Sequence, residues 1–305
     1  MSQNQNPSLT GALLVNKPVG PTSHDIVAAI RGILHIKRVG HTGTLDPFAS
    51  GLLIILLGST TRLTEYLHDF PKTYQAVAHL GALSDTGDRT GHITPQDPIK
   101  PSLKDIEQAA QKFLGQIKQT PPAYSALKHQ GQSLYTIARQ EGTAAAANIA
   151  KQKTRTVTIH QLNIVNYQYP TLTLSVTCST GTYIRSLVSD LAASLGTAAY
   201  TDQLERAAIG PWKLTQASTI ENIAKMGLEG LTSQLITPAQ IVSHMPSITL
   251  TDENVAKLKQ GREVRGTFDG TPRNMPIAIL DSSAQLIGIA TQTQSTLLSP
   301  LKILP

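Results

Sequence analysis

The stretch "KRVGHTGTLDPFASGLLIILLG", Lys37 to Gly58, joins a loop rich in Gly, Thr and Pro to an apolar run. The loop holds a single acid, Asp46. Gly40 and Gly43 permit backbone angles that other residues resist, and Pro47 pushes Asp46 toward extended geometry. The run "LLIILLG" predicts a fully buried strand. The sequence therefore predicts a carboxylate that is aimed in a fixed direction beside the core.

A carboxylate fixed in this way has two interpretations. Asp46 could close an Asx-turn where a loop meets a strand, because Asp-Pro is common there. It could instead be a nucleophile or base, which requires partners. Arg185 could pair with it and keep it ionised, Tyr74 could stack on a nucleobase, and His41 could wedge or hydrogen-bond in a nucleic acid. Each has a structural alternative: Arg185 could be a surface arginine, Tyr74 a core tyrosine and His41 a loop histidine.

The composition is that of a basic globular protein. The 305 residues include 26 Lys and Arg against 20 Asp and Glu, a net charge of +6, which favours a polyanionic partner. The one cysteine, Cys178, lies in an alternating run that predicts a buried thiol. No uncharged apolar run is long enough to cross a bilayer, and the polar start "MSQNQNPSLTG" lacks the features of a signal peptide, so we expect a cytoplasmic protein without membrane contact.

Local patterns predict a mixed fold. Strand and helix signals follow one another without regular βαβ alternation, which indicates an α+β domain on a mixed, largely antiparallel sheet. The segment 141–153, "EGTAAAANIAKQK", fits an exposed helix or a loop equally well. Strands are expected at 11–17, 52–57, 72–80, 156–169 and 171–179. Helices are expected at 23–34, 60–67, 103–114 and 180–196. The first is capped by Thr22 or Ser23, the second by Thr60 or Thr61 and the third by Ser102.

A second unit follows a boundary near residues 240–247. It contains a short helix, "TDENVAKLKQG", and the strand signals "PIAILD", "QLIGIATQ" and "LLSPLKILP". Turns are expected at Gly270 and at Asp281-Ser282. This pattern predicts a small β-rich module.

Several common chemistries lack their sequence signatures. One cysteine and the scattered His24, His35 and His41 do not form a zinc-ligand pattern. Neither a Walker A motif, nor G-x-G-x-x-G, nor G-x-S-x-G occurs. We therefore expect neither a metal site nor an organic cofactor.

Five motifs occur in an order that resembles a known family. "NKPVGPTSHD", "GHTGTLDPFASGLL", "KTYQAVAHLG", "PPAYSALKHQGQSLY" and "CSTGTYIRSL" together cover roughly residues 11–210 and are similar to the motifs of the bacterial TruB family, the tRNA pseudouridine-55 synthases. The resemblance implies a pseudouridine synthase catalytic domain over residues 1–240, with an RNA-clamping insert at about 120–155. It also implies a PUA-like RNA-binding domain over residues 245–305.

The resemblance also implies an activity and a set of site residues. The family isomerises a uridine in the T-loop of tRNA, at position 55, to pseudouridine, using an aspartate nucleophile and a flipped-out base. Asp46 matches that aspartate, and Arg185 matches the arginine paired with it. Tyr74 matches the tyrosine stacked on the base and implicated in proton transfer. The expected partner is the T-arm of tRNA, bound by a monomer that needs no protein partner and no cofactor.

Three further residues are assigned to substrate binding by the same resemblance. His41 matches a histidine that fills the space left by flipped bases, Tyr183 matches the tyrosine two residues before the arginine, and Leu204 matches an apolar residue of the uridine pocket. Glu205 departs from the family, which often has a basic residue there. The alanine-rich stretch Thr143–Ala147 is similar to an addition in the loop that closes over the T-arm.

Two other functions remain as alternatives. A non-catalytic RNA-binding protein would share the basic charge, but grip alone does not need Asp46, Tyr74 and Arg185 together. A guide-RNA-dependent synthase of the dyskerin kind would share the motifs. It is disfavoured by the absence of lysine-rich tails and by the insert between Ala123 and Arg155, which resembles that of stand-alone bacterial enzymes.

Overall fold

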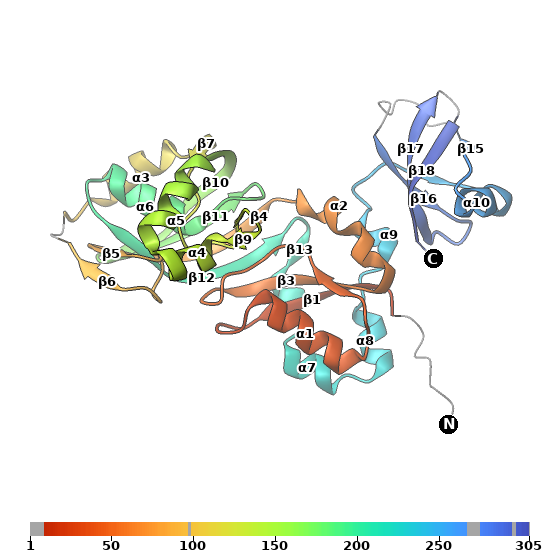
Figure 1. Cartoon of the computed structure of the whole chain (residues 1–305), viewed down its shortest axis with the longest axis horizontal. Coiled ribbons are helices and arrows are strands. Elements are labelled where there is room, and N and C mark those ends of the chain that lie inside the picture. The colour runs from red at the N-terminus through yellow and green to blue at the C-terminus, as the bar shows by residue number, and fades with distance from the viewer. Residues whose placement is uncertain (1–8, 97–98, 267–274, 295–296, 305) are drawn as a thin grey trace.

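The chain is organised around two β-sheets in an elongated molecule. The computed structural model describes residues 9–96, 99–266, 275–294 and 297–304. Figure 1 shows a long sheet with its helices, and a smaller sheet at one end of the molecule that is built from the C-terminal part of the chain. Within the described residues, no helix is long and apolar enough to cross a membrane.

The long sheet has nine strands. They are β1 (Gly11–Lys17), β2 (Val39–His41), β3 (Ser50–Leu57), β4 (Lys72–Leu80), β7 (Gly115–Gln119), β10 (Arg155–Gln168), β11 (Thr171–Cys178), β12 (Ala199–Ile209) and β13 (Trp212–Lys213). The order is β1-β3-β12-β4-β11-β10-β7, with β2 beside β3 and β13 beside β12. Every pairing is antiparallel except that of β12 with β3. The expected mixed, largely antiparallel sheet is confirmed.

The parallel pairing of β12 with β3 forms a short seam between the two halves of this sheet. It contains two register pairs, Glu205 with Ser50 and Arg206 with Gly51. Gly51 has φ of +109°, and a Cβ atom there would lie 2.5 Å from the carbonyl oxygen of Arg206. Only glycine fits this position, because a side chain would collide with backbone. The seam therefore depends on close backbone approach.

Helices pack on both sheets and link their strands. They are α1 (Ser23–Leu34), α2 (Thr64–His68), α3 (Leu103–Gln111), α4 (Leu134–Glu141), α5 (Thr143–Gln152), α6 (Ile184–Ser194), α7 (Ile220–Lys225), α8 (Leu228–Gln234), α9 (Pro238–Ile241), α10 (Asp252–Lys259) and the 3₁₀ turns η1 (Gly58–Leu63) and η2 (Leu214–Gln216). Capping boxes start α1 at Thr22 and α3 at Ser102, as expected. Both α3 and α6 pack in one apolar cluster with β4, β10 and β11, where Cys178 is fully buried as predicted.

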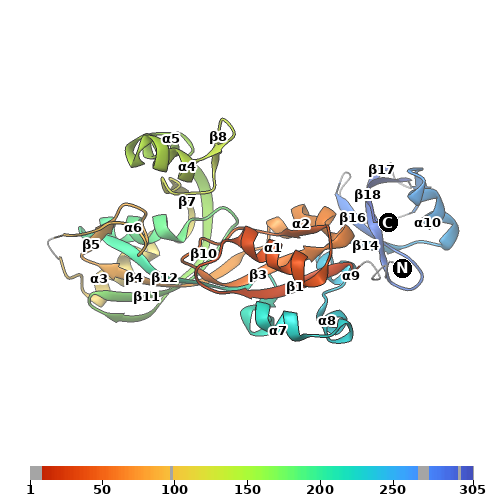
Figure 2. The same ribbon diagram turned by 60° about the horizontal axis from the view of Figure 1, so that its bottom comes forward.

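Two small hairpins and a helix pair project from the sheet. The hairpins are β5 (Ala82–Ser84) with β6 (Ile93–Pro95), and β8 (Lys128–His129) with β9 (Gln132–Ser133). Figure 2 shows α4 and α5 standing clear of the sheet. Ala146 and Ala150 of α5 pack on Leu134 and Ile137 of α4. The alanine-rich segment, which the sequence left open, is thus a helix held by a small local core.

The C-terminal sheet has the order β14-β16-β17-β18-β15, and its strands are β14 (Ser247–Thr249), β15 (Val264–Arg265), β16 (Pro276–Leu280), β17 (Leu286–Gln294) and β18 (Leu297–Ile303). Leu304 shares an apolar cluster with Leu67 of α2. Lys302 forms an ion pair of 2.8 Å with Glu65. The C-terminal unit is therefore packed on α2.

Some expectations for local structure require correction. The helix expected from Thr60 begins as the 3₁₀ turn η1, because the Thr60 hydroxyl is bonded to Gly11 and Leu57 carbonyls at 2.7 and 2.5 Å, and the α-helix starts only at Thr64. The three helices α7 to α9 were not anticipated. The turn at Asp281-Ser282 is present, with Ala284 N–H donating to the Asp281 carbonyl, whereas Gly270 lies outside the described residues.

Candidate active site

The loop between β2 and β3 holds Asp46 rigidly from both sides. On one side, the Leu45 N–H donates to the Ser23 hydroxyl at 2.9 Å, at the start of α1. On the other, the Pro47 carbonyl accepts from Gly20 N–H at 2.8 Å. Within the described part of the chain, no backbone N–H donates to the Asp46 carboxylate, so the side chain does not form an Asx-turn. It is one-third exposed and free to face a cavity.

Arg185, at the start of α6, is the ion-pair partner of Asp46. Its Nη2 atom lies 2.9 Å from Asp46 Oδ2, and its Nη1 atom lies 3.3 Å from Asp88 Oδ2. The same guanidinium donates to the carbonyls of Thr86 at 2.7 Å and Tyr124 at 2.8 Å. The Arg185 side chain is 4 % exposed. The structure brings together the pair proposed from the sequence, and it fixes the arginine by four acceptors from three chain segments.

Asp88 is a second carboxylate on Arg185 that the sequence reasoning missed. It lies in "SDTGDRTG", between β5 and β6, and is buried. Its Oδ1 atom accepts from Thr90 N–H at 2.9 Å and from the hydroxyls of Thr90 and Thr86 at 2.5 and 3.0 Å. Threonines two residues before and after an acid are typical of a turn, so the local pattern hides the long-range contact with Arg185.

The neighbouring strands β4 and β12 supply the floor of the site. Tyr74 of β4 stands opposite Arg206 of β12 in the ladder. Leu204 lies two residues before Arg206 and therefore on the same face of the sheet. Burial raises the pKa of Tyr74, and the nearby charge of Arg206 opposes this shift. Glu205, which alternation directs to the other face, does not line the site, so the departure from the family pattern falls outside it.

Arg206 is fully buried and ties the β2–β3 loop to the seam. Its Nε atom donates to the Leu52 carbonyl at 2.7 Å. Its terminal nitrogens donate to the carbonyls of Gly43 at 3.1 Å and Thr44 at 3.4 Å. The residue was not proposed from the sequence, although its spacing of two from Leu204 would have placed it on the same face.

Tyr183 and His41 differ in their relation to the site. Gln119 of β7 clamps the Tyr183 backbone, accepting from its N–H at 2.7 Å and donating to its carbonyl at 3.0 Å. The Arg155 guanidinium lies 5.1 Å from the centre of the Tyr183 ring. His41 ends β2, where its Nδ1 accepts from Gly43 N–H at 3.2 Å. Burial, helped by the charges of His24 and Arg206, lowers the pKa of His41, so the imidazole is neutral at pH 7.

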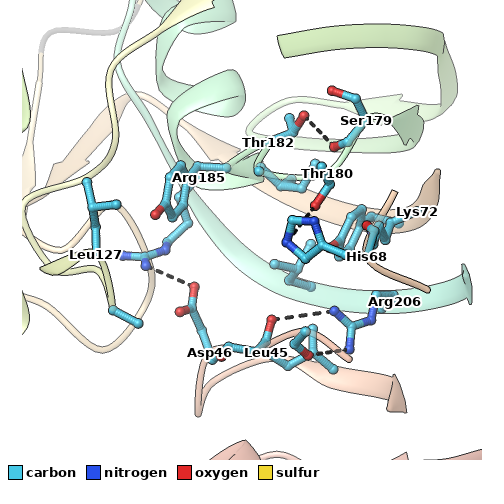
Figure 3. Close-up of a pocket in the computed structure, with 18 of the residues that line it drawn as sticks. Leu45, Asp46, His68, Lys72, Leu127, Ser179, Thr180, Thr182, Arg185 and Arg206 are labelled. Atoms are coloured by element: carbon cyan, nitrogen blue, oxygen red, sulfur yellow. Dashed lines mark hydrogen bonds and ion pairs between the residues drawn. The ribbon is translucent and has the colours of Figure 1, made fainter. Parts of the chain in front are cut away.

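A cavity of about 340 Å³ joins most of these side chains, as Figure 3 shows. Of the six site residues proposed from the sequence, Asp46, Tyr74, Tyr183, Arg185 and Leu204 line it, whereas His41 does not. Asp46 is the one carboxylate among the described residues that line the cavity. Lys72, Arg155 and Arg206 also line it.

The arrangement suits covalent chemistry on a neutral ring. The Asp46 carboxylate is paired with a guanidinium yet still one-third exposed, so it can reach a substrate in the cavity. An aromatic ring and an aliphatic side chain, Tyr74 and Leu204, offer apolar surfaces to a planar base. Among the described residues, no three His, Cys, Asp or Glu side chains are grouped so that they could hold a metal ion.

Comparison with known proteins gives matches over nearly the whole chain. Residues 31–184 match the family described as TruB family pseudouridylate synthase (N terminal domain), and residues 246–304 match pseudouridine synthase II TruB, C-terminal. The tRNA pseudouridine synthase B of Pseudomonas aeruginosa (strain UCBPP-PA14) is 34 % identical over 97 % of this chain and 96 % of its own length. That of Thiobacillus denitrificans (strain ATCC 25259 / T1) is 38 % identical over 93 % and 92 %.

The fold also has solved counterparts. A chain in the crystal structure of a Cbf5-Nop10-Gar1 complex is 25 % identical, with a TM-score of 0.74 over 96 % of this chain and 84 % of that chain. A chain in the structure of an H/ACA RNP bound to a substrate RNA is 22 % identical, with a TM-score of 0.75 over 99 % and 92 %. The second likeness concerns the fold alone.

Proposed function

Because this chain belongs to the TruB family and is a tRNA pseudouridine synthase, an isomerase, we propose that it converts uridine 55 in the T-loop of tRNA to pseudouridine. The T-arm is the proposed binding partner. The proposal further assigns residues 1–240 to the catalytic domain and residues 245–305 to an RNA-binding domain, and it takes the active species to be a monomer without a protein partner.

Asp46 is the proposed nucleophile. Its carboxylate attacks the target nucleoside, the N1–C1′ glycosidic bond breaks, and the uracil turns so that C5 bonds to C1′. The proton on C5 leaves, N1 gains a proton, and the carboxylate is released. Attack at C1′, attack at C6 and a glycal route are all compatible with an aspartate in this position. No atom is added or lost, so the reaction is an isomerisation.

The uridine must leave its stack to reach Asp46. Neither C1′ nor the face of the ring is accessible in a stacked loop, so the base is flipped into the cavity. Tyr74 is proposed to stack on it and to take part in proton transfer, with Leu204 and Tyr183 completing the pocket. His41, outside the cavity and neutral, is proposed to fill the space left by the flipped base.

The observation that carries this proposal is the Asp46–Arg185 pair at 2.9 Å on the wall of the cavity. A protein that only gripped RNA would gain nothing from a buried guanidinium shared between Asp46 and Asp88. Such networks are costly to desolvate. The pair therefore favours catalysis over simple binding.

The insert at 120–155 is proposed to clamp the RNA. It reaches the site directly, since the Tyr124 carbonyl accepts from Arg185, and Leu127 and Arg155 line the cavity. It also carries the exposed cation Lys128. A segment that contacts both the site and the solvent above it is suited to hold the T-arm in place.

The test is incubation of the purified protein with an unmodified tRNA transcript, followed by mapping of pseudouridine at single-nucleotide resolution. We expect conversion at position 55 with no guide RNA and no second protein. A transcript with cytidine at position 55 and the Asp46→Asn variant serve as controls. Conversion at another position, or conversion only with an added guide RNA, would refute the assignment.

A further inference from the structure

Lys72 is a buried cation for which the proposed reaction has no use. It is the first residue of β4, two positions before Tyr74, and is 6 % exposed. Residues two apart on a strand point to the same face, about 6.6 Å from each other along the strand. Its side chain lines the same cavity as Asp46 and Tyr74. Figure 3 places Lys72 on the opposite side of the cavity from Arg185.

The Lys72 ammonium is poorly compensated in the free protein. Of its three donors, one is used, in a bond to the His68 carbonyl. The carboxylate that favours its charge is that of Asp69, whose side chain is 89 % exposed and therefore screened by water. Burial, with the repulsion of Arg206, lowers the pKa of Lys72 to about 8. A cation left in this state gains most from an anionic ligand.

A second buried lysine, Lys17, has more hydrogen-bond partners than Lys72, although burial lowers its pKa to about 8 as well. Lys17 donates to the carbonyls of Pro18 at 2.8 Å and Pro21 at 2.9 Å, and the charge of Asp46 favours its protonated form. Lys17 does not line the cavity. Lys17 therefore has a structural role in its turn, whereas Lys72 has donors to spare and faces the space where substrate enters.

The charge of the cavity as a whole is positive. Arg155, Arg185, Arg206 and Lys72 line it against the single carboxylate of Asp46. Asp46 and Asp88 balance Arg185, and three carbonyls bind Arg206. Among the described residues, Arg155 and Lys72 line the cavity without a carboxylate within ion-pair distance, so the surplus positive charge lies on these two side chains. Uracil is neutral, so the base itself does not account for it.

We propose that Lys72 binds a phosphodiester of the RNA next to the flipped uridine, and so holds the target nucleotide at its backbone while Tyr74 holds its base. This inference rests on the proposed function for its substrate. A base stacked on Tyr74 carries its own sugar and phosphate within reach of a lysine two residues away on the same face. Phosphate contacts of this kind fix register and orientation.

The test combines the Lys72→Met variant with RNA that lacks one charge. Synthetic T-arm stem-loops carry a methylphosphonate either 5′ or 3′ of the target uridine, with 2′-O-methyl sugars at both linkages in every oligonucleotide to prevent strand cleavage. Dissociation constants and single-turnover rates are measured for each protein with each RNA. Lys225→Met, on the exposed helix α7, removes the same charge elsewhere and serves as the matched control.

We expect Lys72→Met to weaken binding of the normal RNA about tenfold or more, the weight of one charge-assisted hydrogen bond. One of the two methylphosphonates should weaken wild-type binding by a similar factor and leave Lys72→Met unaffected. That linkage is the ligand of Lys72. The proposal is wrong if, at both linkages, the methylphosphonate weakens binding of Lys72→Met as much as it weakens binding of wild type. It is also wrong if Lys72→Met binds the normal RNA as tightly as wild type.

Two readouts separate this role from others. A purely structural Lys72 would lower the melting temperature when replaced, whereas a poorly compensated ammonium should leave it unchanged or raised. Lys72→Gln, which keeps a polar tip, repeats the binding test should the methionine variant not fold. Binding is measured without reference to product, so a protein that binds these RNAs through Lys72 but forms no pseudouridine would refute the proposed function and leave this inference standing.

Discussion

Replacing Asp88 with asparagine tests whether the second carboxylate on Arg185 serves the reaction. The amide keeps the size of the side chain but removes its charge. Asp88 Oδ1 accepts from the N–H of Thr90 at 2.9 Å, and Oδ2 faces Arg185 Nη1 at 3.3 Å. Whichever way the amide is turned, its NH₂ group meets one of these two donors. The substitution therefore loses an ion pair and adds a mismatch.

The magnitude follows from what Arg185 retains. Breaking a buried pair costs about 3–5 kcal/mol. Arg185 keeps Asp46 and two carbonyls, so we expect about 2–3 kcal/mol here, because part of the buried charge remains compensated. With Asp88 neutral, the guanidinium is balanced by Asp46 alone and holds the nucleophile more tightly. If the whole loss falls on the chemical step, the rate decreases about 30- to 150-fold.

The assay is single-turnover conversion at saturating tRNA, with the dissociation constant measured separately. We expect binding within twofold of wild type, since Asp88 is buried and offers little surface to RNA. The matched control is Asp85→Asn in the same hairpin, an exposed acid that changes the net charge equally and accepts from His92 N–H at 2.8 Å. An Asp88→Asn rate within threefold of wild type would refute the reasoning.

Four further outcomes are expected. Asp46→Asn should abolish product while leaving tRNA binding nearly intact, as measured by filter binding, because the amide is no nucleophile. The logarithm of tRNA affinity should fall with the logarithm of salt, by roughly 0.7–0.9 per neutralised phosphate, and Lys72→Met should reduce this slope by about one contact. In urea unfolding, the stability of wild type relative to Lys72→Met should rise between about pH 8 and 10.5, because over that range only the unfolded chain keeps the Lys72 proton. Below about pH 8 the difference should not change with pH. The groups that face Lys72 are His68, Asp69, Cys178 and Arg206, and both proteins share them. Truncation after Ser243 should lower the melting temperature measured by calorimetry, because α2 loses its apolar partners. The truncated protein that remains folded should still convert saturating tRNA faster than Asp46→Asn does.

The sequence predicted those parts of the site that local patterns report. The Gly-rich loop and Asp-Pro junction indicate a fixed carboxylate at Asp46, and family resemblance supplies its partner Arg185. The contact of Asp88 with Arg185 was not predictable from the sequence, because an acid in a turn and a distant buried arginine share no local pattern. Arg206 was within reach, since period-two alternation from Leu204 places it on the cavity side.

The same limit applies to the fold. Strands with strong alternation, such as β4 and β11, and helices with clear caps, such as α1 and α3, were predictable from local sequence. Helix α5 was undecidable, because its alanines favour a helix while its weak pattern gives no face; contact of Ala146 and Ala150 with α4 decides it. The α-helix expected from Thr60 starts only at Thr64, and the Thr60 hydroxyl instead bonds to Gly11 of β1, a contact that no local pattern reports.

The short seam between β3 and β12 has a consequence for the order in which the protein forms during synthesis. The bond from Arg206 to Leu52 spans 154 residues of chain, and closing so long a loop is entropically costly before other contacts reward it. The pairing of β1 with β3, on one side of the seam, closes a much shorter loop. A growing chain therefore contains most of its strands before the loop that carries Asp46 is fixed in place. A ribosome-bound or prematurely ended product that stops short of residue 204 lacks part of the cavity wall and cannot bind RNA there.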